Sequence, residues 1–247
     1  MDKLTDNYQI LADVYDQSMN PANYLSWRDL IIEVIDKYKI EKKTALDLAC
    51  GTGNISKILN DLGFKVIGID QSQTMLKVAR HKLPTAEFIE ADLRDFKIDN
   101  INSVNLATCF YDSLNYLLTD EDLIKALKNI YANLADRSIF VFDINPLEKI
   151  LAAQKFTDQV YEDNDYRVVY RSGGQGLFWD IEITINKIGS GQVPIIEHHR
   201  ERGYKEGEIT AFLKQAGFSL LELRRQVKQG QDGKPYLNRQ YFIAQKG

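Results

Sequence analysis

Short apolar segments alternate with amphipathic segments between residues 44 and 144, and this alternation constrains the fold more than any other feature of the chain. The apolar segments are residues 44–50, 65–70, 86–92, 104–110 and 138–144. The helical segments between them are expected at about 55–62, 74–82 and 120–134. Strands that are apolar on both faces and are joined by helices form a parallel sheet covered on both sides. Because such crossovers are right-handed, we predict a doubly wound α/β sheet.

The N-terminal segment, residues 1–40, also has helical spacing. Tyr8, Leu11 and Tyr15 fall on one helical face, and Pro21 interrupts the pattern before a second apolar face begins. We expect this segment to form a helical lid over the site that the sheet carries.

The pattern changes after Pro146. Residues 157–204 hold alternating, aromatic-rich segments separated by glycine turns, which predicts antiparallel strands. A helix and two strands complete the chain, and Asp232-Gly233 between those strands indicates a hairpin. The expected units are a sheet domain of residues 1–146 plus 205–247 and a small antiparallel β insertion of residues 147–204.

Composition restricts the classes of function. The chain has 31 Lys and Arg against 35 Asp and Glu, a net charge of −4, which argues against a general nucleic-acid binder. The polar start MDKLTDNYQI is unlike a signal peptide, and no stretch approaches the length of a membrane span, so we expect a cytoplasmic protein without membrane contact. Cys50 and Cys109 lie in apolar segments without metal-ligand spacing, and no metal site is expected.

The loop after the first strand, LDLACGTGN, carries the chemistry. Gly51 and Gly53 allow a ligand to approach the backbone closely. The residue three positions after Gly53 is Ser56, so the G-x-G-x-x-G pattern of dinucleotide sites is absent. No Gly-Lys-Ser/Thr follows either, which excludes a P-loop.

Three aspartates end the first three strands. Asp47 precedes the glycines and suits a ligand with an ammonium group, because a carboxylate there would repel a pyrophosphate. Asp70 lies 19 residues beyond Gly51, where a carboxylate can accept from both ribose hydroxyls, and Asp92 is placed to accept from an exocyclic amine. An ammonium group, a ribose and an adenine in one row describe S-adenosylmethionine.

At these positions the sequence resembles the class I S-adenosylmethionine-dependent methyltransferases. LDLACGTGN, GIDQSQTML and ADLRDF resemble the three cofactor motifs of that family. CFYDSLNYL and HHRERGYKEGEITAFLKQAGF resemble segments of its small-molecule members, near the antibiotic-sugar N-methyltransferases. The resemblance implies a Rossmann-like sheet of seven strands in the order 3-2-1-4-5-7-6, with the last strand antiparallel.

The resemblance also implies roles for individual residues. Asp47 would orient the methionine amine, and Asp70 would bind the ribose. Asp92 and Leu93 would contact the adenine edge, Met75 would pack on the adenine, and Tyr15 would close over the cofactor. The expected cofactor-binding residues are Tyr15, Asp47, Ala49, Gly51, Gly53, Asp70, Gln71, Met75, Asp92, Leu93 and Phe110.

The expected catalytic residues are Tyr15, Tyr116 and His199. Tyr116 stands where some sugar methyltransferases have a histidine, so their substrate class does not carry over. His199 is adjacent to His198 in a predicted strand, and only one of the two can face a given side. We expect Glu201, two residues further on, to be solvated. Each candidate also has a purely structural interpretation, as a core aromatic, a helix cap or a satisfied strand histidine.

The predicted function is transfer of a methyl group from S-adenosylmethionine to a small-molecule acceptor by in-line displacement. Two alternatives stay open: a non-enzymatic protein that senses the same cofactor, and, less favoured, a nucleotide-dependent oxidoreductase. The insertion at 147–204 is expected to cap the acceptor site. Its alternative role is the contact surface of a homodimer.

Overall fold

A seven-strand sheet forms the centre of the computed structural model, which describes residues 16, 21–99, 103–156, 158–162, 165–191, 193–229 and 235–247. Its strands are β1 (Thr44–Leu48), β2 (Lys65–Asp70), β3 (Glu87–Glu90), β4 (Val104–Cys109), β5 (Ile139–Ile144), β10 (Phe218–Gln229) and β11 (Pro235–Lys246). They lie in the order β10-β11-β5-β4-β1-β2-β3. β1 to β5 pair in parallel, whereas β11 runs antiparallel to both neighbours. The predicted strand order and the antiparallel end of the sheet are confirmed.

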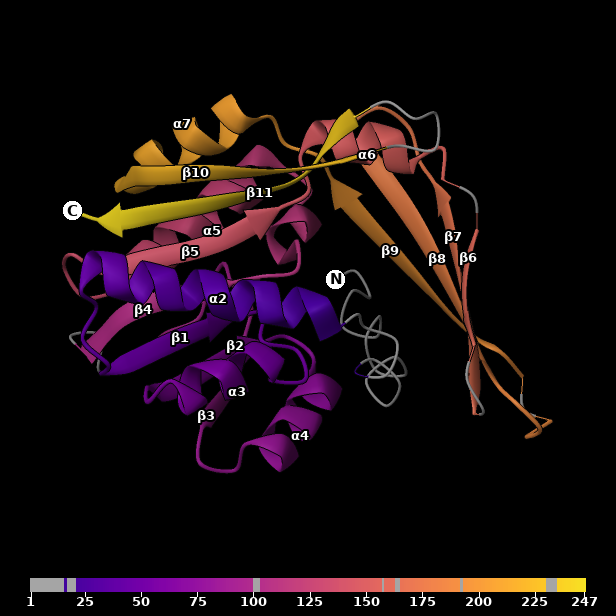
Figure 1. The fold of residues 1–247 in the computed structure, drawn as a ribbon, viewed down its shortest axis with the longest axis horizontal. Coiled ribbons are helices and arrows are strands. Elements are labelled where there is room, and N and C mark those ends of the chain that lie inside the picture. Colours follow the sequence, from indigo (N-terminus) through magenta and orange to yellow (C-terminus); the bar gives the residue numbers. More distant parts are fainter. Residues whose placement is uncertain are drawn as a thin grey trace.

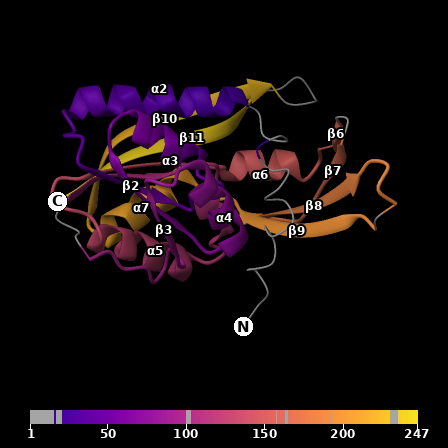
Figure 2. The ribbon, with the colours of Figure 1, turned by 90° about the horizontal axis from the view of Figure 1, so that it is seen from below.

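Helices cover both faces of this sheet (Figure 1). They are α2 (Pro21–Tyr38), α3 (Asn54–Asp61), α4 (Gln73–Lys82), α5 (Asp120–Ala132), α6 (Leu147–Ala153), α7 (Glu206–Ala216) and the short 3-10 helix η3 (Ser113–Tyr116). One apolar cluster joins α2 and α3 to the sheet, and a second joins α5 and α7 to its other face. Figure 2 shows α2 and α5 on opposite sides.

Strand and helix boundaries follow from local chemistry. β1 and β5 are buried along their whole lengths, as central strands of a covered sheet must be. α4 begins where the hydroxyl of Ser72 accepts from the Met75 amide, and α5 begins where Thr119 accepts from the Asp122 amide. α7 ends at Gly217, whose φ of 102° is left-handed.

The segment expected as an insertion contains a second, four-strand antiparallel sheet in the order β6-β7-β8-β9. These strands are β6 (Gln159–Glu162), β7 (Tyr166–Gly173), β8 (Phe178–Lys187) and β9 (Ile195–Arg202). The segment begins with α6, which the sequence analysis did not identify, and α6 packs on β11. Of residues 1–40, the structure describes residue 16 and the chain from Pro21, which begins α2. Tyr8, Leu11 and Tyr15 lie outside the described residues.

Candidate active site

A cavity of about 850 Å³ is lined by residues from the carboxyl ends of β1 to β4 and from the inner face of the four-strand sheet. This volume lies near the upper end of the range for small-molecule sites, about 300–1,000 Å³. Ligands of doubly wound sheets bind at these strand ends. The sequence-predicted residues that line it are Asp47, Ala49, Gly51, Asp70, Gln71, Met75, Asp92, Leu93, Phe110, Tyr116 and His199.

The two glycines of the first loop have different surroundings. A Cβ on Gly51 would meet no atom within 4 Å, and its backbone faces the cavity. A Cβ on Gly53 would lie 3.0 Å from the Cβ of Ala79, and Gly53 is not among the cavity-lining residues. Both glycines have left-handed φ, as does Ala49 at 51°. Gly51 therefore leaves space for a ligand, whereas Gly53 allows α3 and α4 to pack closely.

Asp47 is a buried acid and Asp70 a partly buried one, and neither has an ion-pair partner among the described residues. Asp47 accepts from the hydroxyls of Ser56 at 2.6 Å and Thr108 at 3.1 Å, and burial raises its pKa to about 7. Asp70 accepts from the amides of Gly51 and Ser72, both at 2.8 Å, and burial raises its pKa as well. A cationic ligand would favour the charged form of these carboxyls, which burial alone disfavours.

Asp92 differs because it has a cation of its own. The Arg94 guanidinium donates to both Asp92 oxygens, at 2.9 and 2.6 Å, and these hydrogen bonds lower the Asp92 pKa. The same guanidinium donates to Asp122 at 2.8 Å. Arg94 belongs to the ADLRDF segment, yet the sequence analysis assigned it no role. Arg94 fixes the orientation of the Asp92 carboxyl.

Tyr116 and His199 both line the cavity and contact each other. The Tyr116 hydroxyl lies 3.5 Å from His199 Nδ1, and Nε2 of the same ring lies 3.1 Å from the Glu197 carboxylate. His199 is buried, whereas the neighbouring His198 is exposed on the outer face, as strand alternation requires. Glu197, His199 and Tyr116 thus form a chain of polar contacts from β9 to η3.

A buried charged cluster, not predicted from the sequence, lies beside these residues. Arg239 pairs with Asp143 at 2.7 Å and with Asp112 at 2.8 Å, and the Trp27 indole donates to Asp143 at 3.0 Å. Tyr111 and Asp112 have left-handed φ of 64° and 52°. Non-glycine residues hold this conformation at a cost and are common at functional sites.

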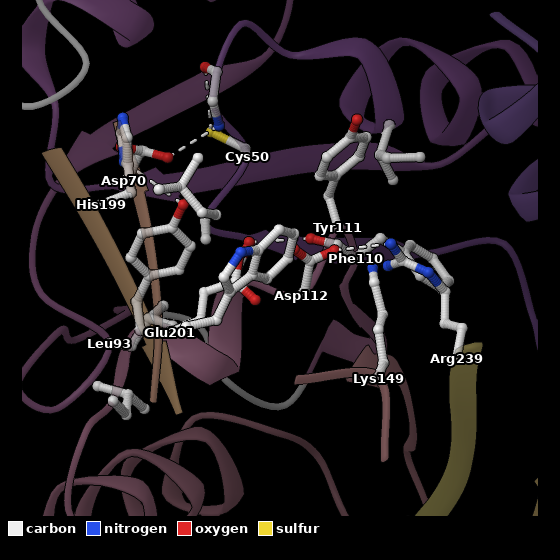
Figure 3. Close-up of a pocket in the computed structure, with 18 of the residues that line it drawn as sticks. Cys50, Asp70, Leu93, Phe110, Tyr111, Asp112, Lys149, His199, Glu201 and Arg239 are labelled. Atoms are coloured by element: carbon white, nitrogen blue, oxygen red, sulfur yellow. Dashed lines mark hydrogen bonds and ion pairs between the residues drawn. The ribbon is translucent and has the colours of Figure 1, made fainter. Parts of the chain in front are cut away.

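Glu201 belongs to the same cluster, so the expectation that it is solvated is wrong. Its exposed fraction is 2%, and burial together with Asp112 raises its pKa well above the usual value. Asn145 donates to Glu201 at 2.6 Å and accepts from Lys149 Nζ at 2.7 Å, and burial lowers the Lys149 pKa. Figure 3 shows Asp112 within this group, with Glu201 on one side and Lys149 and Arg239 on the other.

Strand alternation was the signal that could have identified Glu201, because it shares a face of β9 with His199. Arg239 and Lys149 carried no positional signal in the sequence. Tyr15 lies outside the described residues, so its expected roles stay predictions. In the part of the chain that the structure describes, no three His, Cys, Asp or Glu side chains could hold a metal ion. No described helix is long and apolar enough to cross a membrane.

Known sequences are similar to this chain either over nearly its whole length or over about half of it. Residues 45–137 match a family described as a methyltransferase domain. The chain is 33% identical to YqeM of Bacillus subtilis over 97% of both chains, and the name of YqeM assigns it to the methyltransferases without a substrate. It is 28% identical over 53% of its length to dTDP-3-amino-3,4,6-trideoxy-alpha-D-glucopyranose N,N-dimethyltransferase of Streptomyces venezuelae, covering 56% of that protein.

Solved structures of methyltransferases superpose on nearly the whole chain. An S-adenosylmethionine-dependent methyltransferase from Clostridium acetobutylicum superposes with a TM-score of 0.82 at 26% identity, covering 97% of this chain and 99% of that one. CalS10 of Micromonospora echinaspora, an amino pentose methyltransferase solved with S-adenosylmethionine bound, shares the fold with a TM-score of 0.72 at 19% identity, covering 100% of both chains.

Proposed function

The chain belongs to the S-adenosylmethionine-dependent methyltransferases, and from this premise we propose that it methylates a small-molecule acceptor held between the two sheets. The observation that carries the proposal is that one cavity is lined both by Asp47 and Asp70 and by Tyr116 and His199. The comparisons give no support to the sensor or the oxidoreductase. The relatives named for amino-sugar methylation support a small, polar acceptor.

The residues at the strand ends fit S-adenosylmethionine. Asp47 is buried and Asp70 partly buried, neither pairs with a cation in the described part of the chain, and Gly51 borders open space, which suits a ligand with an ammonium group that lies against the backbone. We propose that Asp47, oriented by Ser56 and Thr108, receives that ammonium group. Each Asp70 oxygen accepts one backbone amide and retains a lone pair for a ribose hydroxyl.

The remaining residues expected at the cofactor include apolar side chains on the adenine side. Met75 and Phe110 are buried and line the cavity, and Leu93 lines it beside Asp92. We propose that Met75 and Leu93 contact the adenine while Arg94 holds the Asp92 carboxyl in place, and that Phe110, directly after β4, contacts the cofactor where the acceptor meets it. The apolar walls exclude water from the site.

When bound, S-adenosylmethionine supplies a methyl group on positively charged sulfur, so the protein mainly has to align the acceptor with it. We propose that the Tyr116 hydroxyl accepts the proton that the acceptor loses on methylation and gives its own proton to His199 Nδ1, so that the tyrosine ends neutral. The Glu197 carboxylate, 3.1 Å from His199 Nε2, orients the His199 ring. The four-strand sheet then caps the acceptor, because Tyr170, Trp179 and Ile181 from its inner face line the cavity.

Two measurements test the proposal. Calorimetry should show that S-adenosylmethionine and S-adenosylhomocysteine bind with micromolar dissociation constants, roughly −7 to −8 kcal/mol. Incubation with methyl-labelled S-adenosylmethionine and fractionated cell extract should then transfer label to a small molecule. Binding of NADH without binding of either sulfur compound would overturn the proposal, and transfer of label only to protein or nucleic acid would overturn the acceptor class.

A further inference from the structure

β10 and β11 extend beyond the large sheet. β11 pairs with β5 only over residues 240–245, whereas β10 and β11 continue to pair with each other as far as Gln229 and Pro235. Residues 226–229 and 235–239 therefore form a two-stranded extension, which we call the arm. Figure 1 shows β11 passing beyond β5 toward α6, and α6 contacts β11. Two strands alone are marginally stable in water, so the arm depends on what it packs against.

An irregularity in the arm directs extra side chains into the cavity. Gln226 pairs with Arg239 and Val227 pairs with Leu237, so Asn238 is an additional residue between the two pairs. Asn238 and Arg239 consequently both line the cavity. The Asn238 amide donates to Gln226 at 2.8 Å, which fixes both side chains. Such bulges occur often beside active sites, because they change the direction of a side chain.

The arm directs polar side chains toward the cavity and an apolar side chain toward solvent, which is the reverse of the arrangement in a hydrophobic core. Its cavity-lining residues are Gln226, Lys228, Tyr236, Asn238 and Arg239. Val227 is 60% exposed, whereas Asn238 is only 6% exposed. The hydrophobic effect favours the opposite arrangement, with the valine buried and the amide in water. The cavity side of the arm is therefore suited to a polar ligand rather than to core packing.

Lys228 supplies a positive charge at this surface. No ion pair joins it to an acid in the described ranges, whereas Arg224 and Arg225 on the same strand pair with Glu33 and Glu206. A cation that lines a cavity without a carboxylate partner is suited to an anionic group of a ligand. Phe156 of the adjoining segment and Tyr236 make an edge-to-face contact with ring centroids 6.4 Å apart, and both rings line the same cavity.

We propose that the arm binds the part of the acceptor that does not react, and that this part is a hydroxylated ring joined to an anionic group. The inference rests on the proposed function, because it assigns this ligand to the acceptor. Lys228 pairs with the anionic group, and the amides of Gln226 and Asn238 exchange hydrogen bonds with hydroxyls. The aromatic rings of Tyr236 and Phe156 contact the apolar side of the ring.

The test uses four probes of stated chemistry on the full chain, with and without saturating S-adenosylhomocysteine. Glucose 1-phosphate and glucuronate carry a hydroxylated ring with an anionic group, whereas glucose and inorganic phosphate each carry one of the two features. At least one of the first pair should bind with a millimolar constant, about tenfold more tightly than glucose or phosphate. A preference between these two identifies the anion as phosphate or carboxylate. Equal or absent binding of all four probes overturns the inference.

Matched variants locate the binding. Lys228→Met should weaken binding of the preferred probe about threefold to tenfold, an effect limited by the exposure of this lysine. Lys214→Met removes the same charge from an exposed position on α7 and should leave probe binding unchanged. Equal effects of the two variants overturn the inference. S-adenosylhomocysteine should bind both variants normally, and its failure to bind the unmodified chain would contradict the proposed function instead.

Discussion

At the scale of single residues, the carboxyl groups of the site differ in their partners, and this difference suggests their roles. Asp92 has an arginine, whereas Asp47 and Asp70 have only neutral donors. Asp112 and Asp143 share Arg239. The sequence located the first three acids, because each ends a strand, but it could not show which of them lacks a cation.

The affinity for S-adenosylhomocysteine should depend on pH through Asp47. Its pKa, raised to about 7 by burial, leaves the carboxyl neutral below that pH, and a neutral carboxyl does not attract an ammonium group. We expect affinity to fall about tenfold per pH unit below pH 7 and to level off above it. Calorimetry across this range measures the effect. Asp47→Asn should bind weakly at every pH, and a pH-independent affinity of the unmodified chain would contradict the assignment.

Asp70→Ala should weaken cofactor binding without unfolding the chain. The substitution removes the acceptor expected for the ribose and the hydrogen bond that holds the Gly51 amide. We therefore expect the binding free energy of the cofactor to weaken by about 1.5–3 kcal/mol, which is a tenfold to hundredfold higher dissociation constant. Calorimetry gives the affinity, and a thermal melt reports folding. Asp61→Ala, which removes an exposed carboxyl on α3, is the control. Unchanged affinity in the Asp70 variant would show that Asp70 only caps the loop.

Arg239→Met should destabilise the fold strongly, because it leaves Asp112 and Asp143 buried without their cation. We expect about 3–5 kcal/mol lower free energy of unfolding, measured by urea denaturation. Arg200→Met breaks the exposed pair with Asp180 and should cost less than about 1 kcal/mol. If the free energy of unfolding fell by similar amounts in the two variants, the buried cluster would contribute no more to stability than a surface ion pair.

At the scale of secondary-structure elements, the sequence predicted the strands of the large sheet and most of its helices. Their periodicity is local, and each strand is apolar on both faces because helices cover the sheet. α6 was missed because its seven residues adjoin a segment of alternating strands. The two glycines of the first loop were given one shared role, although the elements around them assign different ones.

Substitution of each glycine by alanine should separate packing from ligand binding. Gly53→Ala places a methyl group 3.0 Å from Ala79 at a left-handed φ, so we expect a loss of about 2 kcal/mol or more in unfolding free energy. Gly51→Ala has the same backbone penalty but meets no atom, so its stability should fall by only about 1 kcal/mol. Its added methyl group should instead weaken S-adenosylhomocysteine binding. Denaturation and calorimetry test both, and the reverse pattern would contradict this division.

At the scale of the whole molecule, two sheets divide the cavity between them. The ends of β1 to β3 supply the residues expected to hold the cofactor, whereas β7, β8 and β9 supply much of the opposite wall. Asn115 and Asn145 connect the two parts, since Asn115 donates to the carbonyls of Asn145 and Arg202. These hydrogen bonds join the four-strand sheet to the end of the large sheet beside the cavity.

Replacement of residues 157–203 by a short linker should preserve cofactor binding and abolish methyl transfer. The deletion removes His199 and Glu201 from the cavity but leaves Asp47 and Asp70 in place. Calorimetry with S-adenosylhomocysteine and labelled-methyl transfer to extract fractions measure the two properties separately. A folded variant that methylates the same acceptor at the normal rate would assign acceptor selection to the segment around Tyr116. The four-strand sheet would then be better explained as an assembly surface.

The sequence by itself determined the order of the large sheet and the position of three acids at its strand ends. The strands and the acids at their ends follow from apolar periodicity, which is a local property, whereas the strand order followed from the resemblance of the motifs to the class I methyltransferases. Only the tertiary structure decided which polar groups are buried together. Asp143 and Arg239 are separated by 96 residues, and Glu201 reaches Asn145 across 56. Such pairs form because packing brings distant segments together and excludes water from their charges, which local sequence cannot specify.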